Sequence, residues 1–304
     1  MTLEMSVLVL GGTGHIGYET RRALATRATV IAPTRTHVDL TDVAAVRELV
    51  RDAKPAVIIN AAAYTAVDAA ESDADACERL NAELPAILGE ECARLDALLV
   101  HFSSDYVFDG TKRSPYLETD AANPLSVYGR SKLAGDRAIE ASNAAHLIVR
   151  TSWVYSTRGR NFPLTMLRLA RGRAELRVVN DQTGAPTAAP AIAQAVARVL
   201  DSLWRAADFT AASESASGVY HMTAGGSTTW YEFAKTILAS DPRAHEQVCA
   251  AILPIATTEY PTPALRPAYS VLDNAKLAAH FGVRLPSWLD QWQAVVATMQ
   301  GRGG

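Results

Sequence analysis

The first half of the chain alternates short aliphatic runs with longer stretches of helical periodicity. The aliphatic runs predict buried β-strands at Val7–Leu10, Thr29–Ile31, Ala56–Asn60, Leu98–Ser103 and His146–Arg150. The stretches between them predict helices at Ile16–Ala25, Val43–Ala53, Ala76–Leu95 and Val127–Ser142. This alternation is typical of βαβ units, in which parallel strands form one sheet with helices on both faces. We therefore expect an α/β protein with a doubly wound parallel sheet.

The pattern changes after about residue 155. Helical stretches at Asn161–Arg171 and Ala191–Trp204 are separated by connections rich in Gly, Pro and Thr, and prolines interrupt the C-terminal part. Residues 206–217 are small and polar, which predicts a surface loop. We expect residues 1–155 to form the main domain. Residues 156–304 are expected to form mainly a smaller lobe, interleaved with it.

Composition narrows the classes of partner. The chain has 304 residues, of which 49% are hydrophobic, and a formal charge of −3. This near-neutral balance predicts neither a nucleic-acid partner nor a membrane surface. The first apolar run, Val7–Leu10, is too short to cross a bilayer, and no basic segment precedes it. Three cysteines without metal-type spacing fit a cytoplasmic protein.

A glycine-rich turn directly follows the first predicted strand. Residues 11–17 read GGTGHIG, which matches GxxGxxG from Gly11 and GxGxxG from Gly12. A strand before such a turn and a helix after it indicate a Rossmann-type dinucleotide site. Glycines there allow a sharp turn and a close approach of the backbone to a pyrophosphate, which meets the N–H groups of the helix. A turn without a ligand is the alternative.

The end of the second predicted strand bears on the choice of dinucleotide. Sites for NAD usually have an acidic residue there to hold the ribose 2′-hydroxyl. Here the strand runs into Ala32, Pro33, Thr34 and Arg35, with no acid at its tip. Arg35 could meet a 2′-phosphate, which favours NADPH over NADH, or it could be a solvated surface arginine.

Hydroxyl and amine groups follow the fourth predicted strand. That strand runs toward Ser104, and Tyr128 and Lys132 have the spacing Tyr-x-x-x-Lys. Residues four apart share one face of a helix, so the ammonium is expected to lie near the phenol and to lower its pKa. Tyrosine then becomes a usable acid–base group. Most Tyr-x-x-x-Lys pairs are ordinary helix faces, and it is the position after Ser104 that makes this pair a catalytic candidate.

Together these features resemble the extended short-chain dehydrogenase/reductase family. Within it, ordered segments are similar to reductases of dTDP-4-dehydrorhamnose. The segments begin at Asn60, Ser104, Pro124, Arg150, Asp181 and Pro261 and read NAAAYTAVD, SDYVFDG, PLSVYG, RTSWVY, DQTGAPT and PTPALRP. The resemblance covers nearly the whole chain. It implies that the first domain binds NADP(H) and carries the catalytic residues, and that the second lobe mainly binds substrate.

The resemblance also assigns roles to single residues. The implied catalytic residues are Ser104, Tyr128 and Lys132. Tyr128 would donate a proton to the keto oxygen of the sugar, Lys132 would hold the nicotinamide ribose, and Ser104 would hydrogen-bond the same oxygen. The cofactor-binding set adds to Tyr128 and Lys132 the residues Gly11, Gly12, Thr13, Gly14, His15, Ile16, Gly17, Arg35, Asp39, Leu40, Ala62, Ala63, Tyr64 and Thr65.

The implied substrate-binding set extends into the second lobe. It comprises Val67, Ser104, Asp105, Tyr106, Tyr128, Trp153 and Arg266. Trp153 and Tyr106 could instead be core aromatic residues. Arg266 could contact the nucleotide diphosphate or form a structural salt bridge.

Some residues depart from the pattern. Relatives described as Mg²⁺-bridged dimers carry a glutamate in the glycine turn, where this chain has His15. We therefore predict no metal site, leave a need for Mg²⁺ open and expect a monomer or homodimer. His15, His101 and His221 have no metal spacing and are expected to be ordinary buried or surface histidines.

The resemblance implies reduction of dTDP-4-dehydro-β-L-rhamnose by NADPH, with NADH as a possible donor. Two alternatives stay open at the sequence level. One is a reductase of another 4-keto deoxysugar nucleotide, because the motifs describe the keto group better than the sugar. The other is a non-catalytic NADP-binding regulatory subunit, against which the intact Ser104, Tyr128 and Lys132 argue.

Overall fold

A six-stranded parallel sheet forms the centre of the larger body. The computed structural model describes residues 5–300. The strands are β1 (Ser6–Leu10), β2 (Thr29–Ile31), β3 (Val57–Asn60), β4 (Leu98–Ser104), β5 (His146–Thr151) and β10 (Gly218–His221). Their order is β2-β1-β3-β4-β5-β10, and every neighbouring pair is parallel. The chain leaves β1 for β2 on one side and returns to β3 on the other, so the strand order reverses at β1.

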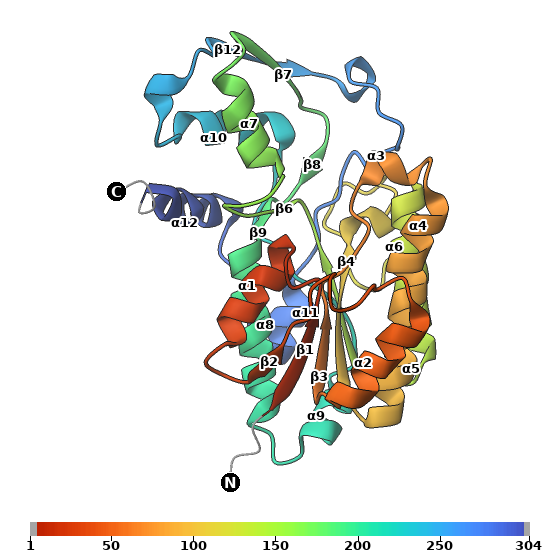
Figure 1. The fold of residues 1–304 in the computed structure, drawn as a ribbon. Helices are drawn as coiled ribbons and strands as arrows, with labels where there is room; N and C mark the ends of the chain where they lie inside the picture. The colour runs from red at the N-terminus through yellow and green to blue at the C-terminus, as the bar shows by residue number, and fades with distance from the viewer. Residues whose placement is uncertain (1–4, 301–304) are drawn as a thin grey trace.

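Helices cover both faces of this sheet (Figure 1). One face is covered by α1 (His15–Leu24), α8 (Ala189–Trp204) and α11 (Ala275–Phe281), and the other by α2 (Val43–Ala53), α5 (Leu84–Leu95) and α6 (Val127–Ala141). The side chains of β1, β3, β4 and β5 are almost entirely buried, because a doubly covered parallel sheet has no solvated face. This confirms the expected doubly wound, Rossmann-type α/β architecture.

A smaller lobe lies beyond the carboxyl ends of the strands, at the top of Figure 1. Its strands β7 (Glu175–Val179) and β12 (Ala251–Ile255) form a two-stranded parallel sheet. Helices α7 (Phe162–Ala170), α10 (Trp230–Ala239) and α12 (Trp288–Gln300) surround a separate core. Aromatic side chains, among them Tyr155, Phe233 and Trp292, fill the centre of that core.

Short elements connect the two bodies. Two-residue strands pair β6 (Val154–Tyr155) with β9 (Thr187–Ala188), and β8 (Thr183–Gly184) with β11 (Thr228–Thr229). Helices α3 (Val67–Ala70) and α4 (Ala74–Glu78) follow β3. Because β10, α8 and α11 come from residues after 156 yet pack on the large sheet, the second half of the chain contributes to both bodies.

Two segments differ from the sequence expectation. Residues 206–217 do not form a loop throughout, because Phe209–Ser215 is helix α9, capped by Asp208 through a 3.0 Å hydrogen bond to the amide of Ala211. The predicted helix Ala76–Leu95 is divided by a π-helical segment, Arg79–Glu83. Such segments often mark functional positions.

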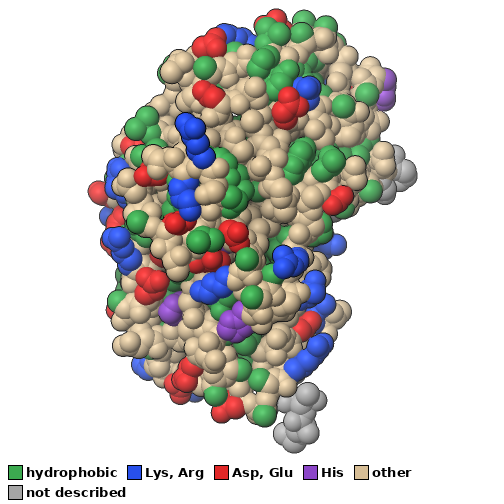
Figure 2. Space-filling view, turned by 180° about the vertical axis from the view of Figure 1, so that it is seen from behind, with side chains coloured by type: hydrophobic (Ala, Val, Ile, Leu, Met, Phe, Trp, Pro, Cys, Tyr) green, Lys and Arg blue, Asp and Glu red, His purple; other side chains and the backbone are tan. Residues whose placement is uncertain are grey.

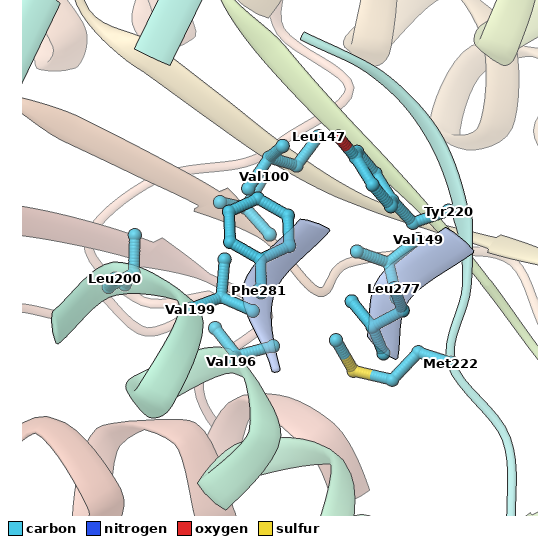
Figure 3. Close-up of a pocket in the computed structure, with 10 residues that line it drawn as sticks. All are labelled: Val100, Leu147, Val149, Val196, Val199, Leu200, Tyr220, Met222, Leu277 and Phe281. Atoms are coloured by element: carbon cyan, nitrogen blue, oxygen red, sulfur yellow. The ribbon is translucent and has the colours of Figure 1, made fainter. Parts of the chain in front are cut away.

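An apolar space lies between the large sheet, α8 and α11 (Figure 3). It is lined by Val100, Leu147, Val149, Val196, Val199, Leu200, Tyr220, Met222, Leu277 and Phe281. The hydroxyl of Tyr220 donates to the carbonyl of Ala216 at 2.8 Å. This space belongs to the packing of the core.

Basic and acidic side chains are intermixed on the face seen in Figure 2. Within residues 5–300, no helix is both long enough and apolar enough to cross a membrane.

Candidate active site

The glycine turn packs directly against the end of β3. Gly11 has a φ of +71°, and a Cβ there would lie 2.5 Å from the amide nitrogen of Ala62. A Cβ on Gly17 would lie 2.3 Å from the carbonyl oxygen of Gly11. Glycine is therefore required at both ends of the turn, because no side chain fits between the turn, β3 and α1.

The first turn of α1 is open to an anion. Its N-cap residue is Gly14, which has no side chain to accept a hydrogen bond from the free N–H groups of the helix. Unpaired N–H groups and the positive end of the helix dipole favour a phosphate at such a position. The structure thus provides the cradle that the glycine spacing predicts.

A cleft of about 240 Å³ opens at this turn. It lies where the strand order reverses, at the carboxyl ends of β1 and β3, the usual ligand position in an open α/β sheet. The cleft is lined by Leu10, Gly11, Gly12, Thr13, Gly14, Pro33, Thr34, Arg35, Val38, Asp39, Leu40, Thr41, Ala61, Ala62, Ala63 and Leu80. Nine of the expected cofactor residues are in this set: Gly11, Gly12, Thr13, Gly14, Arg35, Asp39, Leu40, Ala62 and Ala63.

The other expected cofactor residues lie elsewhere. Ile16 packs on the sheet core, and Gly17 supports the turn from within α1. His15 contacts the loop after β6, where its Nδ1 lies 2.7 Å from the hydroxyl of Ser156 and its Nε2 lies 3.2 Å from the carbonyl of Arg160.

Two charged residues shape the outer end of the cleft. Arg35 is exposed beyond the end of β2. Asp39 accepts hydrogen bonds from the amide and hydroxyl of Thr41 at 2.9 and 2.8 Å, and the backbone hydrogen bond is the main cause of its lowered pKa. A hydrogen-bonded carboxylate and an exposed guanidinium therefore flank this end of the site.

Residues 61–65, the strip that directly follows β3, are held in place by Asn81, which was not expected from the sequence. Asn81, fully buried in the π-helical segment, accepts from the amide of Tyr64 at 2.9 Å and donates to its carbonyl at 3.1 Å. It also donates to the hydroxyl of Ser131 on α6 at 3.0 Å. The π-helical segment thereby joins the residues after β3 to α6, the helix that carries Tyr128 and Lys132. A lone asparagine within a helical pattern gives no signal of this task.

Ser104 and Tyr128 meet at the carboxyl end of β4. Ser126 caps α6 by accepting from the amide of Gly129 at 3.1 Å, which places Tyr128 in the first turn. A Cβ on Gly129 would lie 2.3 Å from the carbonyl oxygen of Tyr106, so glycine allows α6 to approach the segment after β4. The hydroxyl of Ser104 interacts with the phenol of Tyr128.

Lys132 lies one turn further along α6 but does not bond to the phenol. Its Nζ donates to the carbonyl of Phe102 at 2.7 Å and lies 3.2 Å from Nε2 of His101. Burial raises the pKa of Tyr128, and the hydroxyl of Ser104 opposes this. The expectation of a lowered pKa for Tyr128 is therefore wrong for this structure, because burial outweighs the neighbouring groups and raises it.

Asp105 and Tyr106 follow Ser104 in a short 3₁₀ turn, Asp105–Val107. Burial raises the pKa of Asp105 to about 7, although hydroxyls of Ser270 and Ser104 partly oppose this. The ring of Tyr106 meets that of Tyr128 edge-on, with centroids 5.8 Å apart. Asp105 and Tyr106 therefore lie beside the phenol of Tyr128.

Trp153 marks the junction with the second lobe. It adopts a left-handed backbone conformation with φ of +46°, and its ring stacks on Trp230 at a centroid distance of 3.5 Å. A Cβ on Gly184 would come within 2.5 Å of the Trp153 ring. Trp230, the first residue of α10, was not singled out from the sequence, because its pairing depends on tertiary structure.

Arg266 forms the salt bridge that the sequence left as one alternative. Its guanidinium donates to Asp68 of α3 at 2.8 Å and also interacts with the phenol of Tyr106. Val67, the first residue of α3, precedes Asp68. This pair connects the C-terminal loop to the rim of the site. In the part of the chain that the structure describes, no cluster of His, Cys, Asp or Glu could hold a metal ion.

A doubly wound sheet with a glycine turn at its switch point, beside a Ser–Tyr–Lys set, defines a nicotinamide-dependent oxidoreductase of the Rossmann type. A family model described as the RmlD substrate binding domain matches residues 5–300. The dTDP-4-dehydrorhamnose reductase of Burkholderia thailandensis is 47% identical over 93% of this chain and 95% of its own length. The enzyme of that name from Escherichia coli K12 is 42% identical over 93% and 94%.

Solved structures agree with the sequence relatives. A dTDP-4-dehydrorhamnose reductase from Clostridium acetobutylicum superimposes with a TM-score of 0.88 at 35% identity, over 97% of this chain and all of that one. One from Bacillus anthracis, in complex with NADP, has a TM-score of 0.88 at 30% identity, with the same coverage. This chain therefore belongs to the dTDP-4-dehydrorhamnose reductase family.

Proposed function

We propose that this enzyme reduces the 4-keto group of dTDP-4-dehydro-β-L-rhamnose to give dTDP-β-L-rhamnose, with NADPH as the reductant. The observation that carries the proposal is the meeting of Ser104, Tyr128 and Lys132 at the end of β4, next to the cleft at the switch point. The family relationship supplies the substrate, since the relatives named above are dTDP-4-dehydrorhamnose reductases.

The cleft fits a dinucleotide. Gly11 leaves no room for a Cβ, and the N-terminus of α1 has no side-chain cap, which leaves its N–H groups available to an anion. Gly11, Gly12 and Gly14 would hold the pyrophosphate, while Arg35 would pair with a 2′-phosphate. Lys132 would hold the nicotinamide ribose. When bound, NADPH supplies the hydride.

Tyr128 is the proposed proton donor to the sugar oxygen. Burial keeps its phenol protonated, which is the state that a donor needs. Ser104 stands beside it, so two hydroxyl groups can hydrogen-bond one oxygen and stabilise the negative charge that develops there. The protein thus polarises the keto group and orients it.

The substrate would lie between the two bodies. Val67, Tyr106 and Trp153 come from the end of the large sheet, and the second lobe supplies the stacking partner of Trp153. Arg266 is the candidate for the diphosphate, which would then compete with Asp68 for its guanidinium.

We further infer that the enzyme acts in the cytoplasm as a monomer or homodimer. The three cysteines are unpaired, and Cys77 and Cys92 are buried, which fits a reducing compartment.

Replacement of Tyr128 tests the proposal. Tyr128→Phe should lower kcat by roughly 10²- to 10⁴-fold, because the proton donor is lost, while NADPH binding is retained. The control is Tyr260→Phe, which changes an exposed tyrosine in the second lobe. Activity is measured as NADPH oxidation with freshly generated dTDP-4-dehydro-β-L-rhamnose. A nearly fully active Tyr128→Phe variant would contradict the mechanism.

The same assay separates the remaining alternatives. If the wild-type enzyme binds NADPH but turns over a different 4-keto sugar nucleotide, that nucleotide replaces dTDP-4-dehydro-β-L-rhamnose as the proposed substrate. Binding without turnover of any keto sugar would favour a non-catalytic subunit. Parallel assays with NADH, in wild type and Arg35→Ser, test the 2′-phosphate contact, whose loss should reduce the preference for NADPH by about tenfold.

A further inference from the structure

A chain of three polar side chains runs through the large sheet beneath the active site. Asn60 and His101 are directly opposite each other on β3 and β4, and Nδ2 of Asn60 lies 3.1 Å from Nδ1 of His101. Nε2 of His101 lies 3.2 Å from Nζ of Lys132. All three side chains are at most 1% exposed. Buried polar groups cost free energy unless their hydrogen bonds are satisfied, so the direction of each bond matters.

The backbone of the strip at residues 61–65 fixes the direction of the hydrogen bonds at the Asn60 end of this chain of side chains. The amide of Ala62 donates to Oδ1 of Asn60 at 3.2 Å, which turns the NH₂ group of Asn60 toward His101. Nδ1 of His101 must then accept, and the single proton of the neutral imidazole lies on Nε2. That N–H points at Lys132. An ammonium has no lone pair to accept it, whereas a neutral amine does.

A charged Lys132 requires the opposite direction throughout. The ammonium would donate to Nε2, and the imidazole proton would move to Nδ1. Asn60 would then have to present its carbonyl to the ring and its NH₂ group to the N–H of Ala62. Charge on the lysine, the tautomer of His101 and the orientation of Asn60 therefore change together.

We propose that His101 is a positioning residue that couples protonation of Lys132 to the orientation of the Asn60 amide at the edge of the cofactor cleft. The inference deepens the proposed function and rests on it for the role of Lys132. In the free protein the neutral amine, with the imidazole proton on Nε2, is the form present above the pKa of Lys132. The ribose hydroxyls of NADPH are good acceptors for an ammonium, so binding of the dinucleotide draws a proton onto Lys132.

Other groups face Lys132 from the neighbouring elements. Asp136 on α6 acts on it electrostatically and is itself paired with Arg150 of β5 at 3.2 Å. The thiol of Cys77 on α4 acts in the same direction as Asp136, and the phenol of Tyr128 lies one turn earlier on α6. Burial outweighs these groups and lowers the pKa of Lys132 to about 8, which places the change within reach of experiment.

The tautomer of His101 can be observed directly. Ring nitrogens of ¹⁵N-labelled histidine are followed by NMR in the free protein from about pH 6 to about pH 10, a range that brackets the pKa of about 8 for Lys132. The His101 proton should move from Nδ1 to Nε2 as the pH rises. Asn60→Asp should hold the Nδ1–H form at every pH, because its carboxylate accepts from both Ala62 and His101.

One tautomer of His101 throughout the wild-type titration would overturn the coupling. No NADPH or sugar is present in this experiment, so it is independent of the reductase assay. A protein that shows the tautomer change but has no reductase activity would contradict only the proposed reductase function. An active reductase without the tautomer change would contradict only the proposed coupling. Asn60→Asp is isosteric, which keeps the comparison available if larger substitutions at His101 prevent folding.

Proton uptake on NADPH binding gives a second readout. Calorimetry in buffers of different ionisation enthalpy should show that the wild type takes up most of one proton at a pH above the pKa of Lys132. His101→Gln should take up little, because its amide oxygen accepts from the ammonium and keeps Lys132 charged. His221→Gln, a change at a buried histidine of β10 without contact to Lys132, should match the wild type. Equal uptake in His101→Gln would contradict the proposal.

Discussion

The two bodies of the molecule differ in how their cores are built. The large sheet buries aliphatic strands between two layers of helices, and its binding features follow the ends of consecutive strands. The small lobe packs aromatic rings around two short strands that are far apart in sequence (Figure 1). Strands β1 to β5 of the first body follow one another along the chain, whereas the core of the second body joins segments that are far apart in the sequence.

This difference separates the two tasks of the site. Apart from Leu80, the residues that line the cofactor cleft lie at or just after the ends of β1, β2 and β3, so their positions follow from strand order. The proposed sugar side contains a ring stack, Trp153 with Trp230, and a salt bridge, Arg266 with Asp68, both between distant segments of the chain. Substitutions in one body should therefore affect one binding step and spare the other.

The largest effect should come from Gly17→Ala. The added methyl would lie 2.3 Å from the carbonyl oxygen of Gly11, so the turn or α1 must move. We expect a loss of about 2–3 kcal/mol in the free energy of unfolding and at least about a hundredfold weaker NADPH binding, or about 2.7 kcal/mol. Chemical denaturation and fluorescence titration measure these. Gly172→Ala, where nothing lies within 4 Å, is the matched control. Unchanged NADPH affinity in Gly17→Ala would contradict the assigned cleft.

Trp230→Ala should act on the sugar side alone. Loss of the stack leaves Trp153 unsupported, and we expect a KM for the nucleotide sugar raised by about tenfold, with stability lower by about 2 kcal/mol because Trp230 is only partly buried. The Kd of NADPH should not change. Steady-state kinetics and a separate NADPH titration measure the two, with Tyr231→Ala as a neighbouring aromatic control. A weaker affinity for NADPH would show that the two bodies do not act independently.

A smaller effect distinguishes one buried acid in each body. The pKa of Asp105 is raised to about 7 in the folded protein, so the native state holds a proton that the unfolded chain releases near its ordinary value. Its contribution to stability is thus present at low pH and is lost as pH rises through 7. Asp105→Asn should unfold with a free energy about 1–2 kcal/mol higher than wild type near pH 8, and the gain should vanish near pH 4.

The corresponding acid of the small lobe is Asp241, which pairs with Arg171 at 2.8 Å. Asp241→Asn removes one partner of an ion pair and should destabilise the protein at pH 8. Urea denaturation across this pH range measures both variants. Stabilisation by Asp241→Asn, or none by Asp105→Asn, would show that pairing does not explain the contrast.

What the sequence revealed follows the same division. The strands and the glycine turn were predictable from local patterns, whereas Asp39, Leu40, Ala62 and Ala63 of the cleft were expected only from the family resemblance. Helix α9 was missed because its short, polar sequence resembles a loop, although Asp208 is a helix-start residue at its N-cap. Trp230 and Asp68 gave no signal, since their partners are distant in the chain.

The pKa of Tyr128 shows a different limit. Residue spacing correctly places Lys132 one turn after Tyr128, but it cannot say which acceptor the ammonium chooses. Nζ of Lys132 donates to the carbonyl of Phe102 at 2.7 Å, and burial determines the direction in which the pKa of Tyr128 shifts. A motif gives proximity, whereas the environment of the buried group sets its ionisation.

The lack of space at Gly184 has a consequence for how the substrate range of this enzyme could be changed. A single methyl group there would reach the Trp153 ring and force it from its stack with Trp230. The size of the residue at position 184 therefore determines where the Trp153 ring can lie, and with it the shape of the proposed sugar pocket. A library of variants at this residue is expected to change this aromatic wall and to leave the proposed proton-transfer and dinucleotide-binding residues unchanged.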